Sequence, residues 1–282
     1  MNEIPPLNIS ALLRKYGLRP NKKLGQNFLQ DPFVLDSIAS VAEIGPTDTV
    51  LEIGPGLGSL TRHLAEAASR VIAVELDRDL IPPLKAVTAA YDNINIIHGD
   101  ILNLSPKDLG LKPDYLVVAN IPYYITSAII RHLLAQSPNE ENDLTPRRIV
   151  LTVQKEVAKR ICAEPGDMSL LALSVQIYGK PRIAKHIPAG AFFPPPRVDS
   201  AVLCIDIYPS PQIKPEFHNR FFKLIKAGFS QKRKTLRNSL SAGLHIPAPE
   251  AEALLKEANI DPMRRAETLS IEEWQSLCSF YE

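Results

Sequence analysis

The chain has 282 residues, which allows one large domain or a large domain followed by a small one. Hydrophobic residues make up 45% and charged residues 22%, a balance that is typical of globular proteins and excludes a disordered or fibrous chain. The net charge of +1 excludes a general polycation, but Lys and Arg gather in residues 14–23 and 223–237. Such local basic patches predict a polyanionic partner that meets particular faces of the molecule.

The three cysteines, Cys162, Cys204 and Cys278, are odd in number and far apart. Their spacing predicts neither a disulfide framework nor a metal site, and we expect a reducing, cytoplasmic setting. The first ten residues lack the basic and apolar regions of a signal peptide, and no apolar run approaches the length of a membrane span. We therefore expect no contact with a membrane.

The N-terminal segment begins with a predicted helix over residues 8–16. The sequence GQNFL (25–29) then suits neither a strand nor an amphipathic helix. It is either a structural loop or a cap over a bound cofactor, with Asn27 and the Leu29 backbone supplying hydrogen bonds. A helix follows over residues 31–41, where Asp31 is the expected N-cap and Pro32 the first helical residue.

A glycine-rich turn occupies VLEIGPGLGSLT (50–61), between a buried strand and a helix. Glycines let the backbone approach a ligand closely, and a helix N-terminus offers free N–H groups. A dinucleotide fingerprint, G-x-G-x-x-G, would require Gly at position 59, where this chain has Ser59. The spacing G-x-G-x-G instead favours S-adenosylmethionine, with a tight structural turn as the alternative.

Strands and helices alternate through the next 150 residues, which predicts an α/β doubly wound sheet. PSPQIKP (209–215) is typical of a linker, and the remaining sequence is helical, ending in a helix with a capping box at Ser270 and Glu273. We therefore expect two domains, residues 1–208 and 209–282. The further predicted strands are 70–76, 93–99, 114–119, 148–153, 180–187 and 201–208, and the helices between them are 126–136, 154–162 and 168–176.

Four polar or glycine positions fall at the ends of predicted strands, namely Gly54, Glu75, Asp100 and Asn120. Ligands bind at the carboxyl ends of strands in such sheets, so these positions share one rim. Glu75 is placed to accept hydrogen bonds from the two ribose hydroxyls of an adenosine. Asp100 is placed to accept one from an adenine amino group.

If the acceptor is taken to be an exocyclic amine of adenine, the sequence Asn120-Ile121-Pro122-Tyr123 at the end of a predicted strand offers the groups that such chemistry needs. That amine is a poor nucleophile and needs no strong base, but two acceptors holding its N–H bonds favour a tetrahedral nitrogen. We expect the Asn120 side-chain carbonyl and the Ile121 backbone carbonyl to be these two acceptors, while Pro122 stiffens the turn. Tyr123 offers a face on which the base stacks, and Phe192, in a proline-braced loop, is predicted to close the other side. The alternative is a helix entry with Tyr123 as packing.

With these motifs the chain resembles the small-subunit (16S) ribosomal RNA adenine N6,N6-dimethyltransferases over nearly its full length. The resemblance implies a Rossmann-like class I methyltransferase sheet with a small C-terminal all-helical domain that binds RNA or the ribosome. It implies transfer of four methyl groups to two adjacent adenines near the 3′ end of the RNA, on an assembling subunit. The matching motifs are GQNFL (25–29), LEIGPGLGSLT (51–61), VELD (74–77), GD (99–100), NIPYYIT (120–126), AFFPPPRVDSAV (191–202) and FSQKRKTLRNSL (229–240).

The resemblance also implies site residues. The acceptor adenine would bind at Asn120–Tyr123. We predict phosphate contacts from the basic residues, and we expect a monomer with no metal. The cofactor would bind at Asn27, Leu29, Gly54, Glu75, Asp100 and Asn120. The basic clusters themselves, rather than the resemblance, predict RNA contacts at Lys22, Lys23, Lys232, Arg233, Lys234 and Arg237.

One departure from the family pattern keeps an alternative open. The second motif position, usually Leu, is Ile121, as in the large-subunit RNA adenine methyltransferases that confer macrolide resistance. The role predicted for Ile121 is carried by its backbone carbonyl, so Ile in place of Leu should not alter the chemistry. A non-catalytic RNA-binding assembly factor and a small-molecule methyltransferase are further alternatives. The basic segments disfavour the last of these.

Overall fold

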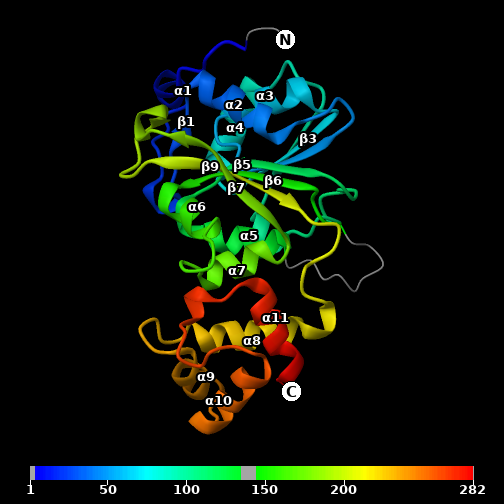
Figure 1. The fold of residues 1–282 in the computed structure, drawn as a ribbon. Helices are drawn as coiled ribbons and strands as arrows, with labels where there is room; N and C mark the ends of the chain where they lie inside the picture. The colour runs from blue at the N-terminus through cyan, green and yellow to red at the C-terminus, as the bar shows by residue number, and fades with distance from the viewer. Residues whose placement is uncertain (1–3, 135–143, 282) are drawn as a thin grey trace. The chain divides into compact units, whose positions relative to one another are not determined.

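The computed structural model describes residues 4–134 and 144–281 of the chain. Contacts divide the chain into two compact units. The sheet unit comprises Met1–Ala158 and Pro181–Ile207, and the helical unit comprises Lys159–Lys180 and Tyr208–Glu282 (Figure 1). The predicted functional division at residue 208 stays a prediction.

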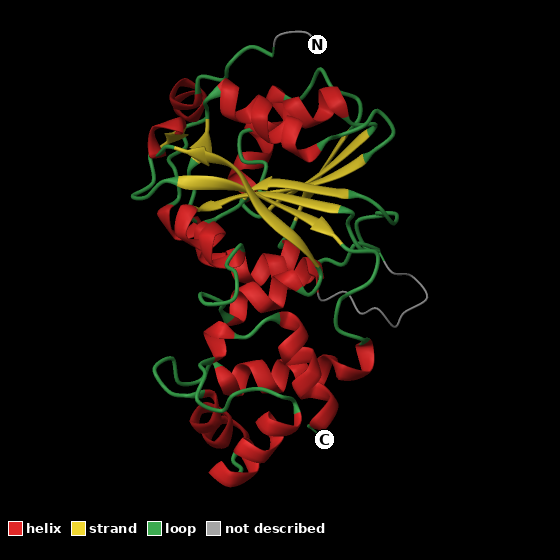
Figure 2. Cartoon of the chain, in the orientation of Figure 1, coloured by secondary structure: helices red, strands yellow, loops and turns green. Residues whose placement is uncertain are grey.

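The sheet unit contains a seven-stranded sheet with the order β4-β3-β2-β5-β6-β9-β7 (Figure 2). The strands from β4 to β6 pair in parallel, whereas β9 pairs antiparallel with β6. This confirms the predicted doubly wound sheet and each of its predicted strands. The bounds are β2 Thr49–Ile53, β3 Arg70–Glu75, β4 Ile94–His98, β5 Leu116–Asn120, β6 Arg148–Gln154, β7 Gly179–Ile187 and β9 Ser200–Ile207.

Helices cover both faces of the sheet, with α2 and α3 on one face and α5 on the other (Figure 1). The predicted N-cap is confirmed, since the Asp31 carboxylate accepts a hydrogen bond from the Val34 N–H at 3.1 Å. Helix α5 begins at Thr126 as predicted, and the last two residues of that predicted helix, 135 and 136, lie outside the described residues. The α-helices are α1 Ile9–Lys15, α2 Pro32–Ala42, α3 Ser59–Ala67, α4 Ile81–Val87, α5 Thr126–Leu134 and α6 Lys155–Ile161, the last crossing between the two units along the chain.

The chain reverses its direction of travel across the sheet at β2. It adds β3 and then β4 on one side of β2, and β5 and then β6 on the other. Helices that leave β2 and β5 on opposite sides open a crevice at the carboxyl ends of these two strands. Asn120 ends β5 and the glycine turn follows β2, so both predicted motifs lie at this crevice. The short 3₁₀ helices of the unit are η1 Lys22–Leu24, η2 Arg78–Leu80, η3 Ile101–Asn103, η4 Tyr123–Ile125 and η5 Ala189–Ala191.

A separate two-stranded pair joins segments that are far apart in sequence. Strand β1 (Phe28–Leu29) runs antiparallel to β8 (Phe192–Phe193). Phe28 is opposite Phe193, and Leu29 is opposite Phe192. Leu29 and Phe192 point into the core beneath α2 and α3, while Phe28 and Phe193 pack with Ile9 of α1.

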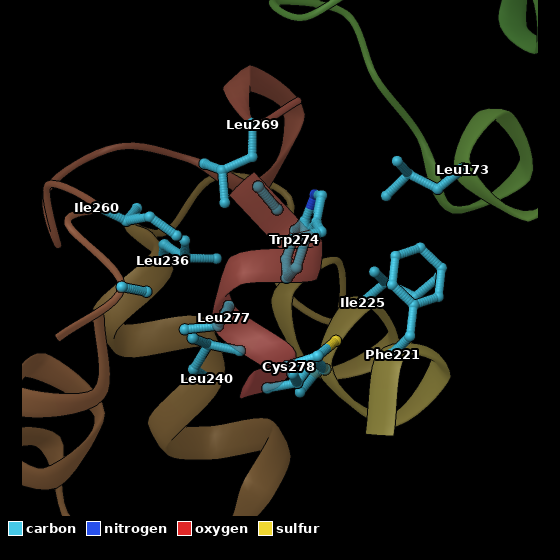
Figure 3. Packing of buried hydrophobic residues seen from close by; sticks show 14 of the residues in the cluster. Leu173, Phe221, Ile225, Leu236, Leu240, Ile260, Leu269, Trp274, Leu277 and Cys278 are labelled. Atoms are coloured by element: carbon cyan, nitrogen blue, oxygen red, sulfur yellow. The ribbon is translucent and has the colours of Figure 1, made fainter. Parts of the chain in front are cut away.

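The helical unit packs around Trp274, which is fully buried (Figure 3). Trp274 lies on α11, whose predicted capping box at Ser270 and Glu273 is confirmed. Helices α8 and α9 cross closely, because a Cβ built on Gly243 of α9 would lie 2.5 Å from the Ala227 Cα of α8. The helices are α7 Leu170–Gln176, η6 Pro215–Phe217, α8 His218–Gly228, α9 Leu236–Leu244, α10 Ala248–Glu257, η7 Ala266–Thr268 and α11 Ile271–Phe280. In the part of the chain that the structure describes, no helix is both long and apolar enough to cross a membrane.

Candidate active site at the carboxyl ends of β2 and β5

A cavity opens at the carboxyl ends of the strands and encloses about 1010 Å³, including the part open to solvent. Its walls come from the segment before β1, the glycine turn, and the ends of β3, β4 and β5. Nine of the predicted site residues line it, so the structure brings together positions as far apart in sequence as 27 and 123. These residues are Asn27, Leu29, Gly54, Glu75, Asp100, Asn120, Ile121, Pro122 and Tyr123.

The charge of the cavity wall is one-sided. Three carboxyl groups line it, from Glu52, Glu75 and Asp100, whereas none of the described lining residues is a Lys, Arg or His. A pyrophosphate would find no basic side chain in the described wall to balance its charge, while an ammonium or a sulfonium would be attracted by the carboxylates. The wall therefore fits a cationic ligand and disfavours a dinucleotide.

The glycine turn adopts backbone conformations that other residues rarely take. Gly54 has φ +68° and Gly56 has φ +60°. A Cβ on Gly54 would point into open space within the cavity, whereas one on Gly56 would lie 3.1 Å from the Phe28 ring. Gly54 thus leaves room for a ligand, and Gly56 leaves room for β1.

Both carboxylate oxygens of Glu75 accept hydrogen bonds from the backbone. Oε2 accepts from the Gly56 N–H at 2.9 Å, and Oε1 accepts from the Asp77 N–H at 2.8 Å. Burial raises the pKa of Glu75, and these two N–H groups act against that rise. The carboxylate is therefore fixed in direction, with its remaining lone pairs free for a ligand.

Asp100 follows β4 and caps η3. Its Oδ1 accepts a hydrogen bond from the Leu102 N–H at 3.0 Å. That bond orients the carboxylate in the cavity wall on the side of β4. The adenine contact predicted for Asp100 stays a prediction.

Glu52 is a site residue that the sequence patterns did not single out. It lies in β2, is 1% exposed, and lines the cavity. Among the described residues, nothing donates a hydrogen bond to its Oε2. Burial raises the pKa of Glu52 to about 8, and the nearby Glu75 carboxylate adds to the rise. The available signal was an acidic residue flanked by apolar residues within a strand.

The segment Asn21–Leu29, which we name the N-terminal strap, closes one side of the cavity. The Asn120 Nδ2–H donates to the Asn27 backbone carbonyl at 3.0 Å, across 93 residues of sequence. The Gln26 Nε2–H donates to the Asp77 carboxylate at 2.6 Å. Because the Asn27 carbonyl can only accept, the Asn120 amide must turn its NH₂ toward it and its carbonyl oxygen away.

Tyr123 is held at both ends. Its backbone carbonyl accepts a hydrogen bond from the Thr126 hydroxyl at 3.1 Å, and its own hydroxyl lies 2.5 Å from the Ser200 Oγ of β9. Burial raises the pKa of Tyr123. The next residue, Tyr124, is 60% exposed at the cavity mouth, where its ring lies against Gly25 of the strap.

Phe192 is not brought to the cavity. It is 2% exposed and lies in the core opposite Leu29, and it is not one of the residues that line the cavity. The stacking role predicted for Phe192 has no contact in this structure to support it and stays a prediction. The alternation of side chains along β8 sends Phe192 inward.

The predicted RNA-binding residues lie outside the cavity. Lys22 and Lys23 are exposed on η1 of the strap, next to the cavity wall. In the helical unit, residues 232–234 are exposed in the loop between α8 and α9. Arg237 forms an ion pair with Glu252 of α10 at 2.9 Å, so one of the predicted phosphate contacts already has a partner.

Comparisons with known proteins cover almost the whole chain. Residues 17–282 match the family model described as Ribosomal RNA adenine dimethylase. Ribosomal RNA small subunit methyltransferase A of Dehalococcoides mccartyi strain CBDB1 is 49% identical over 271 residues, covering 96% of this chain and 91% of that protein. The protein of the same name from Alkaliphilus metalliredigens is 42% identical, covering 97% of this chain and 96% of that one.

Two solved structures share the fold over most of their length. A dimethyladenosine transferase from Plasmodium falciparum has a TM-score of 0.75 at 27% identity, covering 89% of this chain and 95% of that one. The 23S rRNA methyltransferase ErmE has a TM-score of 0.70 at 28% identity, covering 90% of this chain and 99% of that one. The fold, the motif-lined cavity and the match over almost the whole chain lead to one conclusion: this protein belongs to the ribosomal RNA adenine dimethylase family.

Proposed function

We propose that this enzyme transfers methyl groups from S-adenosylmethionine to N6 of two adjacent adenines near the 3′ end of small-subunit ribosomal RNA. Membership of the adenine dimethylase family and identity to small-subunit methyltransferases support the reaction and the RNA. The observation that supports it best is the orientation of Asn120 at the end of β5. Its NH₂ is committed to the N-terminal strap, which leaves its carbonyl oxygen for an acceptor amine.

The cavity suits the methyl donor, which carries a sulfonium and an ammonium, because the described wall contains three carboxyl groups and no Lys, Arg or His. When bound, S-adenosylmethionine supplies an electrophilic methyl group. Glu75, fixed by two backbone N–H groups, would hold the ribose hydroxyls, and Asp100 would hold the adenine amino group. Asn27 and Leu29 would close the strap over the ligand, and the open space beside Gly54 would admit it.

For the acceptor, the Asn120 Oδ1 and the Ile121 backbone carbonyl would accept the two N–H bonds of the adenine N6. Holding both bonds withdraws the nitrogen lone pair from the ring and aims it at the methyl group. Pro122 stiffens this turn, and the Tyr123 ring, which lines the cavity, offers the stacking face. Such stacking contributes about 1–3 kcal/mol per base.

The RNA would be met by exposed basic residues on both units, Lys22 and Lys23 on the strap and residues 232–234 in the α8–α9 loop. We propose that the substrate is an assembling small subunit and that the enzyme acts as a monomer in the cytoplasm. All three cysteines are free thiols, and two of them are buried, which suits a reducing compartment.

The second candidate is methylation of large-subunit RNA, which the similarity to ErmE favours. The higher identity to the small-subunit relatives argues for the first candidate. Since the two candidates share their chemistry, they differ only in the RNA position that gains methyl groups.

The test is methyl transfer from labelled donor to immature small subunits and, in parallel, to large subunits. We expect dimethyladenosine in the small subunit only. Asn120→Ala should lose turnover while remaining folded, and Asn95→Ala, a change to an exposed residue on β4, should retain it. Absence of transfer to either subunit at high enzyme concentration would refute the proposal, and methylation of the large subunit would establish the second candidate.

A further inference from the structure

Tyr123 carries a hydroxyl that base stacking does not require. A phenylalanine would present the same ring face to an adenine, yet here the hydroxyl is turned into the protein, 2.5 Å from the Ser200 Oγ. Ser200 is 0% exposed. The pair is therefore an internal attachment of the stacking ring, rather than a polar group left in water.

The attachment point is rigid because Ser200 begins β9 and pairs with Gln154 of β6 in the antiparallel register. The preceding residue fixes it further. The Asp199 backbone carbonyl accepts a hydrogen bond from the Lys155 N–H at 3.0 Å, and its carboxylate accepts one from the Ala189 N–H at 3.1 Å. Because its backbone is held by this ladder, Ser200 is a fixed point from which its hydroxyl restrains the ring.

The backbone contacts of Tyr123 do not by themselves fix its ring. It lies on η4, a single turn that joins β5 to α5, and its side chain reaches from there along the cavity wall. The Thr126 hydroxyl fixes the Tyr123 backbone, but that bond leaves the side-chain dihedrals unrestrained. The hydrogen bond to Ser200 at the far end of the ring restrains the direction of its axis.

We propose that Ser200 is a positioning residue for methyl transfer, which acts by fixing the Tyr123 ring against the acceptor adenine. The inference rests on the proposed function, because the stacked base is the acceptor of that reaction. Ser200 itself touches neither substrate. Removing its hydroxyl leaves the ring in place but free to tilt, so the adenine N6 is less often aligned with the methyl group.

The test is a double-mutant cycle of Ser200→Ala, Tyr123→Phe and the two together, assayed for methyl transfer to small subunits. Each single change removes the same hydrogen bond, so we expect each to lower kcat/KM by about 3- to 10-fold. The double variant should be no worse than either single. The affinity for S-adenosylmethionine, measured by calorimetry, should stay within about twofold. Ser174→Ala, which removes a mostly buried hydroxyl in α7 that bonds only to backbone, is the matched control and should keep the original rate.

Unchanged kcat/KM in Ser200→Ala, losses that multiply in the double variant, or an equal loss of donor affinity would each overturn the inference. If Ser200→Ala fails to fold, the kcat/KM of Tyr123→Phe tests the inference instead, because this variant removes the other hydroxyl of the same hydrogen bond. A second measurement needs no methyl transfer. Quenching of 2-aminopurine in a short single-stranded RNA should weaken in Ser200→Ala, and equal quenching would overturn the inference. An original chain that transfers no methyl group would instead refute the proposed function.

Discussion

Replacement of Glu52 by Gln should change how stability depends on pH. The pKa of Glu52 is raised from 4.5 to about 8 by burial. Below pH 4.5 both the folded and the unfolded chain keep the proton. Between pH 4.5 and about 8 the unfolded chain loses it while the folded chain retains it, so the free energy of unfolding falls as pH rises. Above about pH 8 both forms are ionised and the dependence ends.

The size of the effect follows from the shift of about 3.5 pKa units at about 1.4 kcal/mol each, which totals about 5 kcal/mol. Gln at position 52 has no proton to lose and keeps the shape of the side chain. Its stability relative to the original chain should therefore rise by about 3.5 kcal/mol from pH 5 to pH 8. Subtracting one chain from the other cancels the groups that titrate in both.

The assay must report the sheet unit. The single tryptophan, Trp274, lies in the helical unit, so its fluorescence follows the other unit. Hydrogen exchange over β2 and β3, measured by mass spectrometry in a urea series at pH 5, 6.5 and 8, reports the stability of the sheet unit. The matched control is Asp92→Asn, which removes an exposed carboxyl between α4 and β4 of the sheet unit and should follow the original chain within about 0.5 kcal/mol. A difference between Glu52→Gln and the original chain that is the same at pH 5 and pH 8 would refute the reasoning.

Two further predictions concern the helical unit. Gly243→Ala should lower the free energy of unfolding by about 1–3 kcal/mol, because its Cβ would lie 2.5 Å from the Ala227 backbone, whereas Gly190→Ala, with open space around it, should not. Urea unfolding followed by Trp274 fluorescence measures the stability of Gly243→Ala, and hydrogen exchange measures that of Gly190→Ala. An unchanged urea midpoint in Gly243→Ala would contradict the close crossing of α8 and α9. Neutralising residues 232–234 should weaken RNA binding and reduce the slope of log affinity against log salt by about 2–3. A slope equal to that of the original chain would exclude this loop from the RNA contact.

The strands, the caps and the cavity position followed from the sequence because each depends on local patterns. Near-continuous apolar runs predicted the parallel strands, and polar residues at their ends predicted one rim. The Asp31 cap and the Ser270 capping box depend on neighbours within three residues, and the structure confirms both.

Other features depend on contacts that no local pattern reveals. Strands β1 and β8 have two residues each, too few for a periodic signal, so their pairing was not predicted. That pairing also determines the direction of the Phe192 side chain, because the alternation along β8 turns this side chain toward the core and away from the cavity. The bond from Tyr123 to Ser200 joins residues 77 positions apart, and the burial of Glu52 required the fold itself.

The pairing of β1 with β8 has a consequence for the two ligands. It hydrogen-bonds the strap over the proposed donor site to the loop that follows η5, so a displacement of one is transmitted to the other. If RNA moves that loop, the affinity for the methyl donor changes with it, and linkage requires the donor to change the affinity for RNA by the same factor. Donor and RNA would then not bind independently, and the ratio of donor affinities with and without RNA would measure their coupling free energy.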